Sequence, residues 1–159
     1  MMEYFSIQEL DLPADIWNPF AQHYAAAHYD PNQMIYFQES QADCFYYLKK
    51  GRVKTFISSE DGTEKALTVY REGNLFGEAA FFDGMPRVSS AVAITACDIV
   101  RIDRQRATQE IVQNPELALA LMKYLARTVR LLSEHIDNMA FLQTDQRIAR
   151  YLCHRAATA

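Results

Sequence analysis

The chain has 159 residues, of which half are hydrophobic and 12% aromatic, enough for one packed domain without extended disorder. Its net charge of −4 argues against a strong nucleic-acid binder. It contains no uninterrupted apolar run of the roughly 18 residues that a membrane helix needs. The N-terminus also lacks the pattern of a secretory signal. We therefore expect a soluble, cytoplasmic protein.

Residues 7–29 carry aromatic and apolar side chains at helical spacing. We expect one or two short helices there, with Trp17, Phe20 and Tyr24 packed inward. Asn18 and Pro19 are typical of the start of the second helix.

Short β-branched and aromatic runs follow at residues 45–48, 53–57, 65–70, 88–94 and 99–102. The Asp61–Gly62 pair between the second and third runs is a strong hairpin signal. Strands this short and regularly interrupted predict an antiparallel sandwich or jelly roll.

A chemically suggestive segment lies between these strands, at residues 74–90. Gly77 lets the backbone approach a ligand, and the next three N–H groups would face an anion if they begin a helix. Arg87 can add a bidentate, charged contact to a phosphate, whereas Glu78 suits a sugar hydroxyl. The segment predicts a phosphate–sugar site; the alternative is an ordinary turn with a surface arginine.

The last long segment, residues 116–142, has no Gly or Pro and follows a helix start at Asn114–Pro115. About 27 helical residues span roughly 40 Å, more than one small roll covers, so we expect a parallel coiled coil between two chains. The alternative is a helix packed wholly on its own roll. The predicted dimerisation residues are Leu121, Tyr124, Thr128, Leu131, His135, Met139 and Leu142.

This order of parts resembles the sensory half of the CRP/FNR family of bacterial transcription regulators. The resemblance rests on Leu75-Phe-Gly-Glu78 with Arg87, on residues 95–103, and on residues 138–142 followed by 146–152. It implies an α+β, mainly β fold: a cyclic-nucleotide-binding β-roll with N-terminal helices over residues 1–112 and a dimerisation helix over 113–142. Residues 143–159 would begin the linker toward a helix-turn-helix domain.

The resemblance also implies site roles. Glu78 would contact the ribose and Arg87 the phosphate, with backbone contacts from Gly77 and Ala79. Ser133, on the long helix, would reach the base. The full set of predicted ligand-binding residues is Phe76, Gly77, Glu78, Ala79, Ala80, Arg87, Val88, Ser89, Leu132 and Ser133.

Two positions depart from the family pattern. Val88 stands where relatives that respond to cyclic AMP carry Ser or Thr, and strand alternation would point Ser89 away from the side that Val88 faces. Leu132 replaces one of two hydroxyl residues that reach the purine. The effector is therefore cyclic AMP (cAMP) or cyclic GMP (cGMP) bound with altered preference, or another small anion.

We expect an effector-binding and dimerisation domain in which the ligand shifts the population of helix arrangements. The hinge, at Phe141, Leu142 and Gln143, would pass the change to a DNA-binding domain beyond the end of this chain. We expect that domain to be absent, by truncation or because the protein is naturally sensor-only. The chain by itself should then not bind operator DNA.

Three alternatives remain: a sensor of a non-nucleotide metabolite, a haem sensor using histidines such as His23, His28 or His135, and a ligand-free dimeric interaction module. Three cysteines without a Cys-x-x-Cys pair fit reduced thiols and do not predict a metal cluster. No nucleophile–base pair, His-Glu-x-x-His motif or P-loop is present, so we do not expect an enzyme or a metal site.

Overall fold

The computed structural model describes residues 15–141, 146, 148–149, 152–153 and 156. The chain divides into two compact units, residues 1–124 and 125–159. Among the described residues, none of the helices combines the length and apolar character that crossing a membrane requires.

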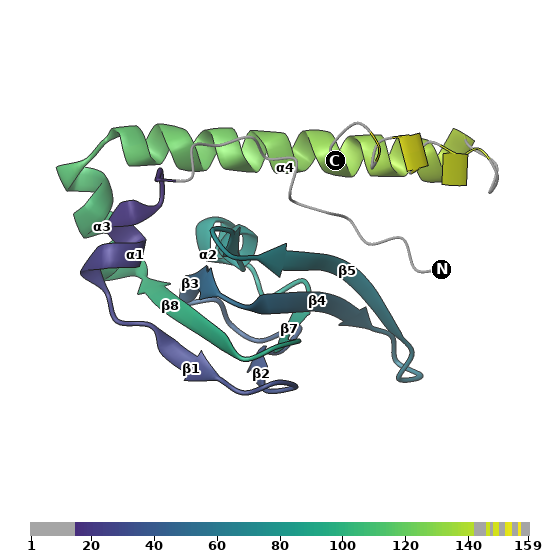
Figure 1. Ribbon diagram of the computed structural model, residues 1–159, viewed down its shortest axis with the longest axis horizontal. Helices are drawn as coiled ribbons and strands as arrows, with labels where there is room; N and C mark the ends of the chain where they lie inside the picture. Colours follow the sequence, from purple (N-terminus) through teal and green to yellow (C-terminus); the bar gives the residue numbers. More distant parts are fainter. Residues whose placement is uncertain (1–14, 142–145, 147, 150–151, 154–155, 157–159) are drawn as a thin grey trace. The chain divides into compact units, whose positions relative to one another are not determined.

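The described part of the first unit contains two four-stranded antiparallel sheets (Figure 1). This architecture confirms the predicted β-roll. One sheet has the order β1 (Ala27–Tyr29), β8 (Cys97–Asp103), β3 (Cys44–Lys50) and β6 (Leu75–Phe76). The other has the order β2 (Met34–Tyr36), β7 (Ser90–Ala93), β4 (Arg52–Ser58) and β5 (Glu64–Arg71).

The predicted hairpin is confirmed between β4 and β5, which pair from Arg52↔Arg71 to Ser58↔Glu64. Gly62 adopts a φ of 83°, a left-handed conformation that glycine reaches without steric cost. The Asp61 carboxylate accepts hydrogen bonds from the Ser59 hydroxyl and the Thr63 N–H, which closes the turn.

The core of the roll is aromatic and aliphatic. Phe45, Phe76, Ile99 and Ile102 are all at most 1% exposed. The first five residues of β3 are buried without alternation. Helices α1 (Asn18–His23) and α2 (Glu78–Asp83) both contact β3, so this strand is covered by helices as well as by the opposite sheet.

Two helices close one end of the roll against β8: α1 and α3 (Arg104–Gln113) (Figure 1). Trp17 and Phe20 are buried there, as predicted. The expectation of helix up to residue 29 is wrong, because residues 27–29 form β1 and pair with β8. Edge pairing with a neighbouring strand is a long-range contact that local periodicity does not report. Residues 7–14 lie outside the described residues.

The long helix is α4 (Glu116–Phe141). Leu121 and Tyr124 are 4% and 1% exposed, and the Tyr124 hydroxyl donates to the Leu75 carbonyl at 2.6 Å. Assigning these two residues to a dimer interface is therefore a mistake: they pack inside their own chain. Apolar periodicity identifies the face of a helix that is buried, but not the surface that covers it.

The remaining predicted dimerisation residues lie further along α4. Thr128 and Leu131 are half-buried. The side chains of His135 and Met139, and all of Leu142, lie outside what the structure describes, as does Gln143 of the predicted hinge. Phe141 is the last residue of α4.

Candidate functional site

The candidate site lies where β6 ends and α2 begins. Gly77, between them, has a φ of 73°. A Cβ atom there would come within 2.7 Å of an Arg87 guanidinium nitrogen and 3.2 Å of the Tyr36 ring. Glycine is thus needed both for the backbone conformation and for the close approach of Arg87.

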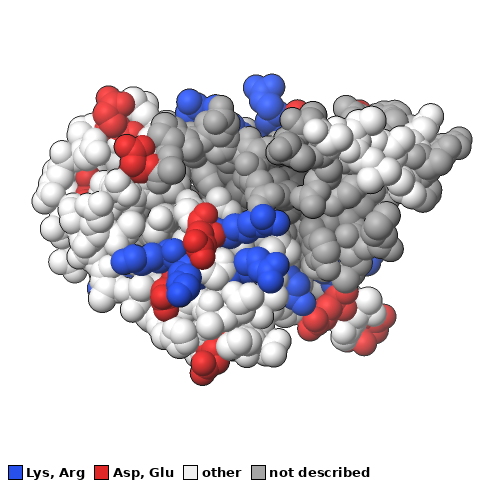
Figure 2. All heavy atoms as spheres, in the orientation of Figure 1, with Lys and Arg blue, Asp and Glu red and all other residues white. Residues whose placement is uncertain are grey.

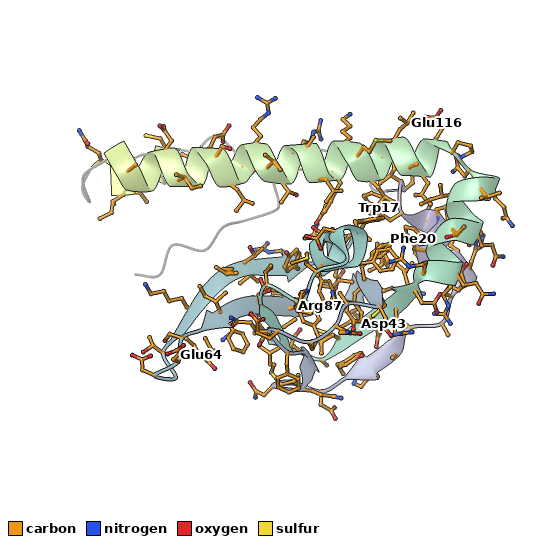
Figure 3. All side chains as sticks on the ribbon, turned by 180° about the vertical axis from the view of Figure 1, so that it is seen from behind. Trp17, Phe20, Asp43, Glu64, Arg87 and Glu116 are labelled. Atoms are coloured by element: carbon orange, nitrogen blue, oxygen red, sulfur yellow. The ribbon has the colours of Figure 1, made fainter. Side chains whose placement is uncertain are left out.

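Arg87 is 3% exposed and lies inside the roll (Figure 3). Its guanidinium donates to the carbonyl oxygens of Gly77 at 2.5 Å and Cys44 at 2.6 Å, and lies 4.3 Å from the centre of the Tyr36 ring. Its Nε is buried and has no hydrogen-bond partner among the described residues. An unsatisfied buried donor costs about 1–3 kcal/mol, so this nitrogen is ready for an acceptor.

The backbone on either side of Arg87 is also fixed. The Arg87 N–H donates to the Ser40 carbonyl, and the Arg87 carbonyl accepts from the Glu39 N–H, both at 2.8 Å. These two bonds tie the connection between α2 and β7 to the segment after β2. Arg87 is therefore fixed both by the hydrogen bonds of its main chain and by those of its guanidinium group.

Arg87 borders a pocket of about 70 Å³ formed by the first unit. Seven predicted ligand-binding residues meet there, together with two tyrosines that the sequence analysis missed. The lining residues are Tyr36, Tyr70, Gly77, Glu78, Ala79, Ala80, Arg87, Val88 and Ser89.

Tyr70 was missed because its place in the β-type run at 65–70 made it appear to be ordinary core. Tyr36 was missed because it lies in β2, a short strand that no pattern in the sequence predicted. No local pattern distinguishes a core tyrosine from one that borders a cavity. Phe76, in contrast, was predicted as a ligand contact but is fully buried and does not line the pocket.

Glu78 is the acidic residue of the pocket and is 6% exposed. Burial raises the pKa of its carboxyl to about 7; a hydrogen bond with its own backbone and the charge of Arg87 only partly offset this effect. The Arg87 N–H groups are directed at main-chain carbonyls. Near neutral pH, Glu78 can thus either accept a hydrogen bond as a carboxylate or donate one as an acid.

Val88 and Ser89 differ from expectation. Both line the pocket, but Val88 is 64% exposed and Ser89 is 6% exposed. The expectation that Ser89 points away from the side that Val88 faces was argued from strand alternation, but β7 begins only at Ser90, after both residues. Ser89 is buried and lines the pocket, so a residue with a hydroxyl group is present there after all.

Leu132 and Ser133 belong to α4 in the second unit and are not among the residues that line this pocket. Leu132 is 46% exposed. The Ser133 hydroxyl donates to the Val129 carbonyl at 3.0 Å, one turn earlier in the helix.

Charged side chains outside the pocket are mixed in sign. On the face shown in Figure 2, Lys and Arg lie interspersed with Asp and Glu. Arg101, for example, donates to Asp43 at 2.7 Å and approaches Asp103 at 3.7 Å. Within the residues that the structure describes, His, Cys, Asp and Glu do not gather in groups of three that could hold a metal ion.

Residues 26–114 match the cyclic nucleotide-binding domain family. The chain is 32% identical over 138 residues to the cAMP-activated global transcriptional regulator CRP of Salmonella typhimurium, covering 86% of this chain and 66% of that protein. The fold is similar to that of the catabolite activator protein of Thermus thermophilus, with a TM-score of 0.70 and 24% identity over 85% of this chain and 63% of that chain. It is also similar to a CooA mutant from Carboxydothermus hydrogenoformans, with a TM-score of 0.79 and 18% identity over 99% of this chain and 71% of that chain.

The match covers more than half of the chain and includes the whole pocket. It also includes the arginine and glycine on which the sequence resemblance rests. The chain therefore belongs to the cyclic nucleotide-binding domain family, as a sensory domain of the CRP/FNR type.

Proposed function

We propose that this chain is the effector-binding and dimerisation part of a CRP/FNR-type transcriptional regulator. The effector is a cyclic nucleotide or a related small anion bound at the pocket between β6, α2 and β7. Its binding is relayed through α4 to a DNA-binding domain. The chain spans about two thirds of the length of the curated relatives that it matches.

The observation that carries this proposal is the buried, incompletely satisfied Arg87. A permanently charged guanidinium is costly to bury unless its donors are paired. Two of its nitrogens donate to carbonyls, and Nε has no partner among the residues described. An oxyanion in the pocket supplies an acceptor for Nε and a negative charge beside the guanidinium.

Dimerisation is assigned to a different face of α4 from the one first predicted. Leu125, Val129, Leu132 and Ile136 follow the alternating spacing of four and three residues that defines a coiled-coil seam. Val129, Leu132 and Ile136 are 63%, 46% and 66% exposed. We call these four residues the seam.

The seam supports the relay because two residues of the predicted ligand site lie at it: Leu132 is a seam residue, and Ser133 is the next residue in the chain. A ligand that touches this part of α4 in either chain would have different contacts in different seam arrangements. Such differential contact is what a population shift requires. The seam also supplies the apolar surface that a parallel helix pair buries.

Binding is tested by the thermal midpoint of the chain with cAMP, cGMP or no ligand. A ligand at about 100 times its Kd stabilises the folded chain by about 2.7 kcal/mol. We expect the shift to disappear in Arg87→Gln and to persist in Arg104→Gln. Arg104 is a matched control. Its guanidinium also lies over an aromatic ring, that of Phe81, and donates to the Phe81 carbonyl, but it does not line the pocket. An unchanged ligand-induced shift in Arg87→Gln would place the site elsewhere.

Dimerisation is tested by light scattering of the eluted chain at several concentrations. Val129→Glu places a charge on the seam and should convert the dimer to monomer. Val112→Glu is the control, since Val112 is 73% exposed and belongs to α3, a different helix from the seam. A monomeric parent, or a Val129→Glu variant that stays dimeric, would contradict the assignment.

A further inference from the structure

We propose that the roll carries a second anion site, held by Arg52 and Arg71, for a small molecule with two oxyanion groups, such as a diphosphate or a dicarboxylate. An open hollow of about 430 Å³ lies at these arginines. Its lining residues are Gly51, Arg52, Arg71, Glu72 and Thr95. Thr95 lies just before β8 and α3 just after it, so the hollow and α3 are at opposite ends of this strand. None of the five residues lines the pocket at Arg87, and the two sites are therefore distinct.

The floor of the hollow is fixed, because three connections between strands meet there. The Gly51 N–H, in the turn between β3 and β4, donates to a carboxylate oxygen of Glu72, after β5, at 3.1 Å. The Arg52 N–H donates to the hydroxyl of Thr95, between β7 and β8, at 3.0 Å. Gly51 has a φ of 96°, and a Cβ on it would collide with the Ala96 carbonyl oxygen. These contacts hold the hollow in shape before any ligand binds.

The two arginines occupy one rung of the sheet. Arg52 is the first residue of β4 and Arg71 the last of β5, and they are directly opposite each other in the antiparallel ladder. Residues in this relation lie on the same face, with Cβ atoms about 4.5–5.5 Å apart. Their neighbours Val53 and Tyr70 are buried, whereas both arginines are exposed. Because side chains alternate along a strand, both arginines lie on the outer face of the sheet.

The charges of the hollow favour an anion with two acceptor groups. Like charges directly opposite on a sheet repel each other, and an anion that contacts both arginines offsets this repulsion. Each guanidinium is a planar fork that binds one oxyanion through two N–H groups. Glu72 adds one negative charge, but its carboxylate already accepts the Gly51 N–H. Two arginines and one glutamate leave the lining with a net charge of +1. A ligand with two oxyanion groups uses both forks, whereas a single carboxylate uses one.

The test is calorimetric titration of the full chain with pyrophosphate, succinate and acetate at constant, low ionic strength. We expect pyrophosphate or succinate to bind more tightly than acetate by about fivefold or more, the upper range for one additional exposed ion pair. The comparison of the first two probes tells a diphosphate preference from a dicarboxylate preference. Arg52→Gln and Arg71→Gln should each weaken the tighter probe by about fivefold. Lys65→Gln is the matched control, because it removes a positive charge from an exposed position of β5 that does not line the hollow.

Three results would overturn the inference. The first is no saturable binding of pyrophosphate or succinate, and the second is acetate binding as tight as both. The third is an affinity that Lys65→Gln lowers as much as Arg52→Gln does, or that Arg52→Gln and Arg71→Gln leave unchanged. Both arginines are exposed, so their substitution leaves the core intact. The thermal shift with cAMP or cGMP should be the same in Arg52→Gln as in the parent chain, and failure of this inference would therefore leave the proposed function standing.

Discussion

Replacing Glu78 by Gln should make the protein more stable at neutral and alkaline pH. The Glu78 carboxyl is buried, and its pKa rises from 4.5 in the unfolded chain to about 7 in the folded one. Between these two values the folded chain binds more protons at this site than the unfolded chain does. Stability contributed through Glu78 therefore falls as the pH rises from about 4.5 to 7, and is constant above that interval.

The size of the effect follows from the same two values. Each pH unit between them corresponds to about 1.4 kcal/mol, so the folded state loses about 3 kcal/mol through this group by pH 8. Gln has nearly the same shape and no charge. We expect Glu78→Gln to match the parent near pH 4 and to exceed its free energy of unfolding by about 3 kcal/mol at pH 8.

The assay is urea unfolding at fixed protein concentration from pH 4 to pH 8. The difference in the free energy of unfolding between variant and parent reports on Glu78 alone, because the other titrating groups contribute equally to both proteins. Glu64→Gln is the control: Glu64 is exposed at the start of β5, far along the hairpin from the pocket (Figure 3). A difference that does not change with pH, or a variant that is less stable at pH 8, would refute the reasoning.

Three further variants test single contacts. Gly77→Ala should weaken effector binding and lower stability, because its Cβ would meet Arg87 at 2.7 Å. Gly84→Ala is the control: Gly84 also has a positive φ but open space around it, so the substitution should lower stability alone. Ligand titration measures the first effect and thermal melts the second. Asp103→Ala removes the side chain that caps α3 by accepting the Arg106 N–H and should cost about 1 kcal/mol in urea unfolding; no loss would mean that water replaces the cap. Tyr124→Phe removes a buried hydrogen bond to a carbonyl and should also cost about 1 kcal/mol, and an unchanged midpoint would contradict its role in tying α4 to the roll.

Much of this protein was predictable because the signals are local. The Asp61–Gly62 turn, the β-branched runs beside it and the helix free of Gly and Pro each depend on neighbouring residues. Gly77, Glu78 and Arg87 also lie within one short segment of the sequence, which contains α2. These residues line the pocket together, although their roles toward a ligand remain a proposal.

Other features depend on contacts between distant segments. Tyr36 and Tyr70 come from β2 and β5, the two edge strands of one sheet, and both line the pocket although they are far apart in the sequence. Ser89 lines the pocket, and β7 begins at Ser90, two residues later than the run at residues 88–94 predicts. Likewise, burial of Leu121 and Tyr124 inside the chain moves the proposed dimer seam to another face of α4.

The sequence by itself thus determined the β-roll, the long helix and the residues that resemble a phosphate site, because short-range propensities and spacing specify them. Only the tertiary structure decided the size of the pocket, the raised pKa of Glu78 and the unpaired Nε of Arg87. These three properties arise from burial, which is set by side chains that are far apart in the sequence and close together only in the folded chain.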